Sequence, residues 1–437
     1  MEKTVDQKIS VFWMRRDLRL FDNAALTHAL KSDFPVLILF VFDKDILEKL
    51  SDKKDKRVEF IHRQLKEINK KLNKKTSSLL VLHDTPKKAF QKLLKDYQVQ
   101  SVYTNHDYEP YAIKRDKDVE EFLSEKGISF HTFKDQVIFE RDEVMKSDGT
   151  PYTVFTPFSK KWKERFYKEG VTEYASEELL ENLLKSPRSE LPSLEDIGFE
   201  ATGFRFTDPH LSEGLIKEYD KKRDVPSVEG TTHAGIHLRF GTISIRNLVN
   251  QAKRQNEQFL NELIWREFFM MILYHFPEVV DHNFRRKYDR VQWRNNEEEF
   301  ELWCRGETGY PMVDAGMRQL NELGWMHNRV RMITAGFLTK HLLIDWRWGE
   351  AYFAEKLLDY ELSSNNGNWQ WAAGTGCDSA PYFRIFNPTT QLKKFDPDLK
   401  YVKTWIKDYK EDYLPEIVEH KSARERALET YKKALDN

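Results

Sequence analysis

The feature of this sequence that most constrains its fold is a regular alternation of short apolar runs and amphipathic segments in the first 135 residues. We expect strands at residues 9–13, 35–42, 78–82, 101–103 and 128–133. Unbroken apolar strands are typical of a parallel sheet that is covered on both faces. The intervening segments have helical spacing, as in Val58, Ile61, Leu65, Ile68 and Leu72. This alternation predicts a doubly wound α/β domain.

The rest of the chain has a different pattern. Residues 136–204 lose clear periodicity and are predicted to form a long interdomain linker over the surface. After about residue 205 the spacing is helical almost throughout, with helices expected at 211–219, 244–254, 257–274, 297–305, 310–323, 327–343, 351–358 and 422–435. The predicted fold is therefore α/β plus all-α, with an α/β domain (1–135), a linker (136–204) and an all-helical domain (205–437).

Composition excludes several classes of protein. The chain has 70 Lys and Arg against 71 Asp and Glu, so binding to DNA would need a local basic face. No apolar run is long enough to span a bilayer, and the first residues lack the apolar core of a signal peptide. Only Cys304 and Cys377 are present, which predicts no disulfide framework and no metal site of usual zinc spacing. We expect a cytoplasmic protein without a membrane partner.

The stretch 359–391 combines acids, amides, glycines and aromatic residues. Three glycines would let the backbone approach a neighbour closely: Gly367, Gly374 and Gly376. Four amide side chains, if buried, need partners that a polar, ring-shaped ligand would supply: Asn365, Asn366, Asn368 and Gln370. The alternative is a surface loop. That alternative would expose four large aromatic residues at considerable cost: Trp369, Trp371, Phe383 and Phe386.

Two motifs in this stretch resemble a known family. Asn-Asn-Gly-Asn-Trp-Gln-Trp-Ala (365–372) and Tyr-Phe-Arg-Ile-Phe-Asn-Pro (382–388) are similar to the flavin-binding region of photolyases and cryptochromes. Trp-Met-Arg-Arg-Asp-Leu-Arg-Leu (13–20) resembles the opening signature of the same family, and the resemblance is closest to class I cyclobutane pyrimidine dimer (CPD) photolyases. It implies a carbon–carbon lyase that repairs dimers with light, by electron transfer from excited reduced FAD to a flipped-out dimer.

The resemblance implies a set of FAD-binding residues. They are Tyr219, Thr231, Thr232, His233, Gly235, Arg266, Asn328, Arg331, Asp359, Tyr360, Glu361 and Asn365. The turn at 230–235 would cradle the diphosphate with backbone amides, although the family usually has Ser at Gly235 and Asp at Glu361. Asn365 aligns with the residue that faces flavin N5. An amide there favours repair over signalling, because plant cryptochromes tend to have an acid and animal ones a cysteine.

The resemblance also implies a set of residues that bind damaged DNA. They are Arg223, Glu262, Trp265, Arg266, Asn328, Arg329, Met332, Trp371 and Gln391. Glu262 would hydrogen-bond the dimer, and Trp265 would stack on the flipped bases. An internal Glu262–Arg266 salt bridge is the alternative, because the two residues are one helical turn apart. Arg223 and Arg329 would contact phosphates.

Catalysis in this family also involves electron transfer within the protein. Trp293, Trp346 and Trp369 match its chain of three tryptophans, which passes an electron to the flavin during photoreduction. Without the resemblance we would interpret all three as core residues. Together with Glu262 and Asn365 they form the predicted catalytic set.

A second, antenna chromophore is possible, and its identity stays open. The glutamate used by folate-binding members aligns with Ala112, so a deazaflavin, a flavin or no antenna remains. The loop Arg15-Arg16-Asp17 could line such a site or form internal salt bridges. We expect a monomer whose partner is UV-damaged DNA. A blue-light-sensing cryptochrome without repair activity is the main alternative. A dinucleotide-dependent flavoprotein is disfavoured because no Gly-x-Gly-x-x-Gly turn follows the first strand.

Overall fold

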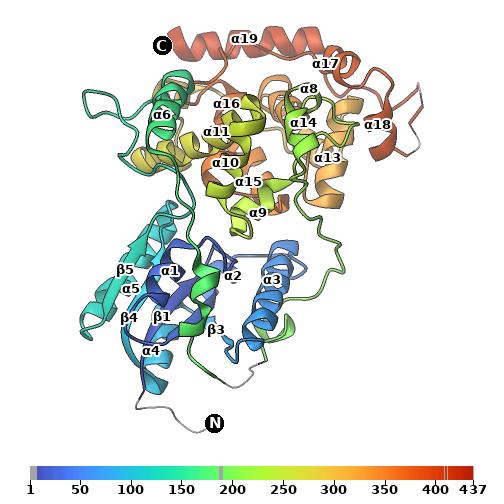
Figure 1. Cartoon of the computed structure of the whole chain (residues 1–437). Coiled ribbons are helices and arrows are strands. Elements are labelled where there is room, and N and C mark those ends of the chain that lie inside the picture. The colour runs from blue at the N-terminus through green and yellow to red at the C-terminus, as the bar shows by residue number, and fades with distance from the viewer. Residues whose placement is uncertain (1–6, 187–189, 408, 411, 437) are drawn as a thin grey trace. The chain divides into compact units, whose positions relative to one another are not determined.

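The computed structural model describes residues 7–186, 190–407, 409, 410 and 412–436 (Figure 1). These residues form two compact units, each built from segments that are distant in sequence. The first unit contains residues up to Glu140 together with Phe166–Pro209 and His233–Gln251. The second contains Arg141–Arg165, His210–Thr232 and residues from Ala252 onward. The predicted functional boundaries, 1–135, 136–204 and 205–437, stay a prediction.

The first unit contains the predicted parallel sheet. Its strands are β1 (Lys8–Met14), β2 (Val36–Asp43), β3 (Leu79–Asp84), β4 (Gln98–Asn105) and β5 (Ser129–Phe133). All neighbouring pairs are parallel, and the strand order is β3-β2-β1-β4-β5. Strands β2 and β3 lie on one side of β1, and β4 and β5 lie on the other, as predicted for a doubly wound sheet.

Alternate residues of the central strands point into two separate cores. Phe12 and Met14 of β1 pack with α1 (Ala24–Leu30) and α3 (Lys56–Asn73) on one face. Val11 and Trp13 pack with α4 (Pro86–Asp96) and α5 (Pro110–Ser124) on the other. Burial on both faces explains why these strands are apolar without interruption.

Further helices lie in the segments that follow the strands. They are α2 (Lys44–Leu47), α6 (Phe155–Glu169), η1 (Ser176–Asn182), η2 (Glu195–Ile197), α9 (Ala234–Phe240) and α10 (Ile245–Gln255). The predicted linker segment is partly packed: Leu183, Leu194 and Ile197 are buried in the core with α1 and α3. Apolar residues in that segment therefore contribute to the first unit.

The named elements of the second unit are helical, as predicted. They are α7 (Glu213–Lys217), α8 (Tyr219–Lys222), α11 (Glu257–His275), η3 (Pro277–Val280), η4 (Arg286–Arg290), α12 (Glu297–Arg305), α13 (Pro311–Leu323), α14 (Asn328–Gly336), η5 (Phe337–His341), α15 (Trp346–Lys356), α16 (Leu362–Ala373), α17 (Pro388–Phe395), α18 (Lys400–Trp405) and α19 (His420–Asp436). Among the described residues, no helix is both long enough and apolar enough to cross a bilayer.

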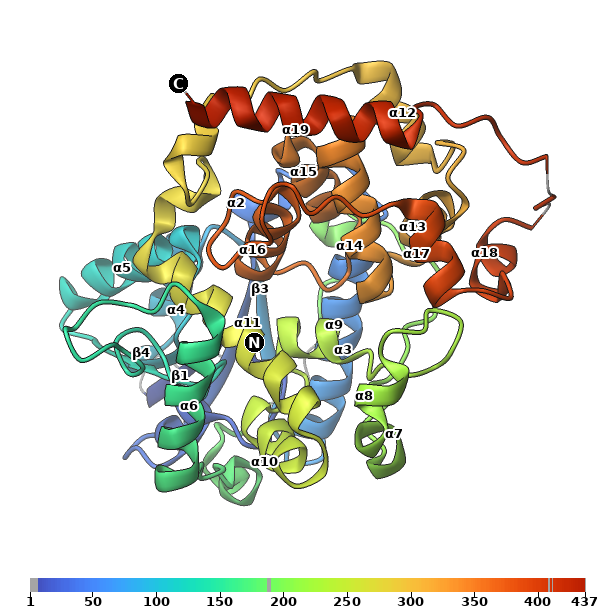
Figure 2. The same ribbon diagram turned by 90° about the horizontal axis from the view of Figure 1, so that it is seen from above.

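Several elements differ from the sequence prediction: the helix expected at 211–219 is divided into α7 and α8, α17 and α18 were not expected, and two further differences lie near the centre of the predicted site region. The single helix expected at 327–343 is divided into α14 and η5, which is a π-helical turn. The stretch after Glu361, where no helix was expected, forms α16, which lies beside α14 in Figure 2. Its amide-rich sequence has little intrinsic preference for a helix, so tertiary packing decides its conformation.

Gly367 explains how α16 packs so closely on α11. A Cβ atom at this position would lie 2.2 Å from the ring of Phe269, well inside van der Waals contact. The predicted close approach at Gly367 is confirmed, and the neighbour is a side chain of the protein itself. Helix α16 also contacts α14 and α15 in the second unit.

Candidate functional site

A pocket of about 110 Å³ in the second unit brings many predicted site residues together. Its wall consists of Asn328, Arg331, Met332, Ala335, Phe353, Leu357, Asp359, Tyr360, Glu361, Ser364, Asn365, Asn368, Trp369, Trp371 and Ala372. These residues come from α14, α15, α16 and the turn that precedes α16. The arrangement explains why motifs about thirty residues apart in sequence can serve one site.

Two ion pairs fix the acidic residues of this wall. Arg331 donates through Nη2 to both carboxylate oxygens of Asp359, at 2.9 and 3.2 Å, and through Nε to the carbonyl oxygen of Met326 at 2.7 Å. Arg266 of α11 donates to Glu361 Oε1 at 3.0 Å. The carboxylates at the start of α16 are therefore held in place by arginines from two other helices.

The amides of α16 do not all need a ligand. Gln370 Nε2 donates to the carbonyl oxygens of Val279 and His282, at 2.9 and 3.2 Å, and Asn366 Nδ2 donates to Val279 at 3.0 Å. Asn368 Nδ2 donates to the Ser364 carbonyl oxygen at 2.8 Å. The expectation that a polar ligand satisfies these amides is wrong for Asn366 and Gln370, because carbonyl oxygens of the chain already accept from both.

Asn365 differs from the buried amides of Asn366 and Gln370. Its Nδ2 donates to Glu350 Oε1 at 2.9 Å and to the Glu350 carbonyl oxygen at 3.1 Å. Among the described residues its Oδ1 accepts no hydrogen bond, although Asn365 lines the pocket and is only 8% exposed. Burial raises the pKa of Glu350, and the hydrogen bond from Asn365 opposes that shift. An unpaired acceptor, aromatic walls and paired charges fit a flat polar ring such as isoalloxazine.

The residues predicted to contact DNA carry internal partners. Glu262 accepts a hydrogen bond from Gln258 Nε2 at 2.7 Å and pairs with Arg223. Arg329 pairs with Asp224 at 2.8 Å and lies over the ring of Phe395. The partner found for Glu262 is thus Arg223 of α8's C-terminal end, and Arg266 instead reaches Glu361.

Trp265 does not present both faces to a ligand. The ring of Phe155 stacks on it with centroids 3.7 Å apart and an interplanar angle of 5°. Phe268 lies edge-to-face with it, and the ring of Phe269 is tilted by 32° with centroids 5.5 Å apart. A stacking role for Trp265 toward flipped bases would therefore use its remaining face, or require Phe155 to move.

The three predicted electron-transfer tryptophans share one hydrophobic core. Trp346 and Trp369 are buried in it, and the half-buried Trp293 packs against it. Trp346 Nε1 donates to Asn283 Oδ1 at 2.9 Å. Gly349 provides the space for Trp369, because a Cβ there would lie 2.1 Å from its ring. This arrangement accommodates both the core interpretation and the electron-transfer interpretation.

Other predicted cofactor and DNA residues lie outside the pocket wall. Tyr219 packs edge-to-face on Phe259, with centroids 5.1 Å apart, and burial raises its pKa. Thr231 and Thr232 precede His233, which has a φ of 50° and occupies the N-cap position of α9 without a capping hydrogen bond from its side chain, so Gly235 falls in the first turn of that helix. Gln391 is half-buried in α17.

Two residues of this region were not predicted from the sequence. Glu350 belongs to α15 and contacts Asn365 although fifteen positions separate them. Phe155 belongs to α6 and contacts Trp265. Neither residue belongs to a recognisable motif, and only the tertiary structure reveals these contacts.

The loop after β1 forms internal salt bridges. Arg15 pairs with Asp116, and Arg16 Nη1 lies 3.1 Å from Asp107 and 3.0 Å from Glu109. The alternative of a salt-bridged loop is therefore confirmed for these two arginines.

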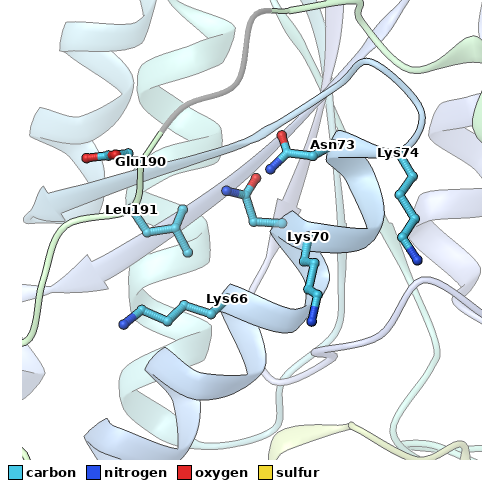
Figure 3. Close-up of a pocket in the computed structure, with 7 residues that line it drawn as sticks. Lys66, Lys70, Asn73, Lys74, Glu190 and Leu191 are labelled. Carbon is cyan, nitrogen blue, oxygen red and sulfur yellow. The ribbon is translucent and has the colours of Figure 1, made fainter.

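A larger hollow of about 560 Å³ lies in the first unit beside α3 (Figure 3). Lys66 and Lys70 of α3 and Lys74, the residue that follows it, line the hollow on one side, with Glu190 and Leu191 on the other. All three lysines are exposed, and no motif falls here. We therefore regard this hollow as a solvated surface and the smaller pocket as the candidate site.

Comparison with known proteins agrees with this choice. Residues 10–177 match the DNA photolyase family model, and residues 259–411 match the FAD binding domain of DNA photolyase. The second match contains every residue of the pocket wall. The deoxyribodipyrimidine photo-lyase of a Synechococcus species is 37% identical over 435 residues, which cover 93% of this chain and 90% of that protein.

The chain belongs to the DNA photolyase family.

Solved photolyase structures share the fold. A class III photolyase from Agrobacterium tumefaciens is 30% identical, with a TM-score of 0.86 over 100% of both chains. An archaeal photolyase from Sulfolobus tokodaii, solved with two FAD molecules, is 33% identical, with a TM-score of 0.81 over 97% of this chain and 99% of that one. The predicted photolyase fold and its FAD-binding domain are thus confirmed, whereas the assignment to class I stays a prediction.

Proposed function

We propose that this protein repairs cyclobutane pyrimidine dimers in DNA with blue light, using FAD bound in the pocket of the second unit. The observation that carries the proposal is the pocket wall. Asn365 offers an unpaired acceptor beside Asp359 and Glu361, within the segment that matches the photolyase FAD domain. When bound and reduced, FAD supplies the electron that splits the cyclobutane ring upon excitation.

The wall residues hold and orient the cofactor in this proposal. Asp359, fixed by Arg331, and the backbone near Glu361, whose side chain is fixed by Arg266, would hold the edge of the ring. Because these carboxylates are already oriented, little ordering is needed when the ring binds. Tyr360 and Asn328 complete the wall. Five residues of the chain would hold the rest of the dinucleotide: Tyr219, Thr231, Thr232, His233 and Gly235.

A second group of residues receives the lesion. Met332 and Trp371 lie in the same wall and provide apolar contact for bases that leave the DNA stack. Glu262 donates or accepts a hydrogen bond at the dimer, and Trp265 packs against it. Arg223, Arg329 and Gln391 contact the DNA backbone. Because Arg223 and Arg329 are paired with Glu262 and Asp224, DNA phosphate has to compete with these carboxylates. Affinity should consequently fall with added salt.

Trp369, Trp346 and Trp293 pass an electron toward the pocket to keep the cofactor reduced. Their placement in and against one hydrophobic core brings the three side chains into one region, and the family resemblance supplies the role. The identity of a second chromophore stays open. We further propose that the protein acts as a cytoplasmic monomer on UV-damaged DNA. Light scattering of the purified protein tests the monomeric state, and imaging of a fluorescent fusion in cells tests the localisation.

The first experiment is a repair assay with the full chain loaded with FAD and photoreduced. An oligonucleotide with one thymine dimer is illuminated with blue light, beside a dark control, and intact thymines are counted. We expect light-dependent repair. Full FAD occupancy and reduction without repair would overturn the proposal and favour a light-sensing role.

Glu262→Ala then tests the lesion contact. We expect the repair yield per absorbed photon to fall about tenfold, because a hydrogen bond to a charged group is worth roughly 1.5–3 kcal/mol. FAD binding should be retained. Glu257→Ala, on the same helix but with a side chain 62% exposed, is the matched control and should repair normally. Equal yields for both variants would remove Glu262 from the mechanism.

A further inference from the structure

One face of the Trp265 indole is closed by the side chain of Phe155, the first residue of α6. The two rings stack with centroids 3.7 Å apart and an interplanar angle of 5°. Rings at this distance are already in van der Waals contact, so no base can enter between them. Trp265 is only half-buried, so another part of its ring stays accessible to a ligand.

The stacked pair is held in place by two other segments of the second unit. Phe268, which is fully buried, lies edge-to-face with both rings, with centroids 5.6 Å from Trp265 and 5.9 Å from Phe155. The main-chain N–H of Phe155 donates to Asp378 Oδ2 at 3.1 Å, in the loop that follows α16. These contacts fix both the plane and the position of the Phe155 ring.

The helix that carries Phe155 is anchored to α11. Trp162 and Glu267 are both buried, and Trp162 Nε1 donates to Glu267 Oε1 at 2.5 Å. Movement of α6 away from α11 would leave these polar groups buried without that hydrogen bond, which is costly. We therefore expect Phe155 to keep its place when a ligand approaches Trp265.

We infer that Phe155 determines specificity by closing this face, so that Trp265 accepts a covalently joined dimer and excludes two separate bases. The inference rests on the proposed function, in which Trp265 contacts the lesion. It adds a positioning residue to that function, and a reason why undamaged DNA binds less tightly.

The argument concerns the number of indole faces that each ligand uses. The two pyrimidines of a cyclobutane dimer are joined by carbon–carbon bonds, so they cannot lie on opposite faces of one indole. Two unmodified neighbouring bases can separate and enclose an aromatic side chain, with stacking on both of its faces. A closed second face removes this mode of binding for undamaged DNA and leaves one-sided stacking of the dimer intact. Exclusion of a competing ligand in this way is a source of specificity.

The test is binding in the dark of FAD-loaded protein to a single-stranded oligonucleotide with one thymine dimer, and to the same oligonucleotide without it, at one salt concentration. For Phe155→Ala we expect the ratio of the two affinities to fall about fivefold, because the undamaged strand gains a stacked base and binds more tightly. Phe155→Tyr keeps a flat ring and should restore the ratio to within about twofold of the wild type. Val154→Ala, at the exposed neighbouring position, is the matched control and should leave the ratio unchanged.

A double variant shows whether Phe155 acts through Trp265. In a Trp265→Ala background, Phe155→Ala should change the ratio no further, because the indole face that Phe155 closes is absent. A merely structural role predicts that Phe155→Ala weakens binding of both oligonucleotides by the same factor. That result, or a further fall of the ratio in the double variant, would overturn the inference. If Phe155→Ala does not fold, Phe155→Val leaves part of the face open and must change the ratio in the same direction.

Failure of the inference can be distinguished from failure of the proposed function. Wild-type protein that prefers and repairs the dimer, while Phe155→Ala keeps the same preference, would reject the inference alone. Wild-type protein that binds both oligonucleotides equally and repairs nothing would reject the proposed function, and the inference with it. FAD content should be equal in wild type and Phe155→Ala, because Phe155 does not line the FAD pocket.

Discussion

The two units both contain arginines paired with carboxylates, but the networks serve different purposes. In the first unit Arg19 and Arg246 surround Asp135, and Arg246 also binds Asp22, with all four residues at most 5% exposed. In the second unit the pair Arg331–Asp359 borders an open pocket, and the side chain of Arg331 is 26% exposed.

The two networks differ in whether a polar atom is left without a hydrogen-bond partner. Burial alone would raise the pKa of Asp135, but the charges of Arg19 and Arg246 hold it below the usual range. The remaining donors of Arg19 reach carbonyl oxygens of Asp22 and Gly241. In the second unit, Asn365 Oδ1 has no partner among the described residues. A closed network of this kind stabilises a fold, whereas an incomplete one is suited to a ligand.

Arg246→Ala tests the closed network and should have the largest effect. Removing one partner leaves Asp22 and Asp135 buried with too little positive charge, so the free energy of unfolding should fall by about 3–5 kcal/mol. Denaturant unfolding followed by circular dichroism measures the change. Arg331→Ala is the matched variant at the pocket. It should destabilise less and mainly weaken FAD binding. If both variants lowered the free energy of unfolding equally, the claim that only the first network mainly stabilises the fold would be wrong.

Gly367→Ala tests the packing behind the pocket. The new methyl group would meet the Phe269 ring, which is itself buried, so the free energy of unfolding should fall by about 1–3 kcal/mol. FAD affinity should fall as well, because α16 carries Asn365. Gly214→Ala in α7 has no atom within 4 Å of the added Cβ and should be neutral or slightly stabilising. Unchanged stability in Gly367→Ala would show that α11 and α16 can separate without cost.

The free energy of unfolding should depend on pH through His327, a buried histidine near the pocket. Burial lowers the pKa of His327 from 6.5 to about 4, and its Nε2 has no partner among the described residues. Between pH 6.5 and 4 the folded state then binds fewer protons than the unfolded state. The free energy of unfolding should consequently fall as pH falls through this window, with a slope of up to about 1.4 kcal/mol per pH unit.

His327→Asn isolates this contribution. His327 Nδ1 accepts a hydrogen bond from the Arg329 N–H at the start of α14, and asparagine can also cap a helix there. The variant should stay folded and show a flatter dependence of stability between pH 6.5 and 4. An unchanged dependence would assign the acid sensitivity to other groups.

Much of the fold could be predicted from the sequence because its signals are local. The strand residues Phe12 and Val11 alternate between two cores, and an uninterrupted apolar run is the pattern that this burial requires. Asn23 has a side chain typical of a helix N-cap, and it caps α1 by accepting from Leu26 N–H. Helix α12 begins and ends at the predicted residues, with Asn296 as its cap.

Other features escaped prediction because their causes lie far away in the chain. Helix α16 forms although its amides favour loops, since Val279 and His282 satisfy Asn366 and Gln370. Trp265 was expected to stack on bases, but the sequence contains no sign that Phe155 already covers one of its faces.

The sequence by itself determined the succession of strands and then helices along the chain, the family, and the residue types available for a flavin site. These properties depend on periodicity and on short motifs, which are written along the chain. The tertiary structure alone decided which polar atoms are satisfied. Glu350 takes both hydrogen bonds from Asn365 and leaves its oxygen for the pocket, and no spacing rule connects those two residues. Hydrogen-bond partners depend on distances in space, which packing of distant segments sets.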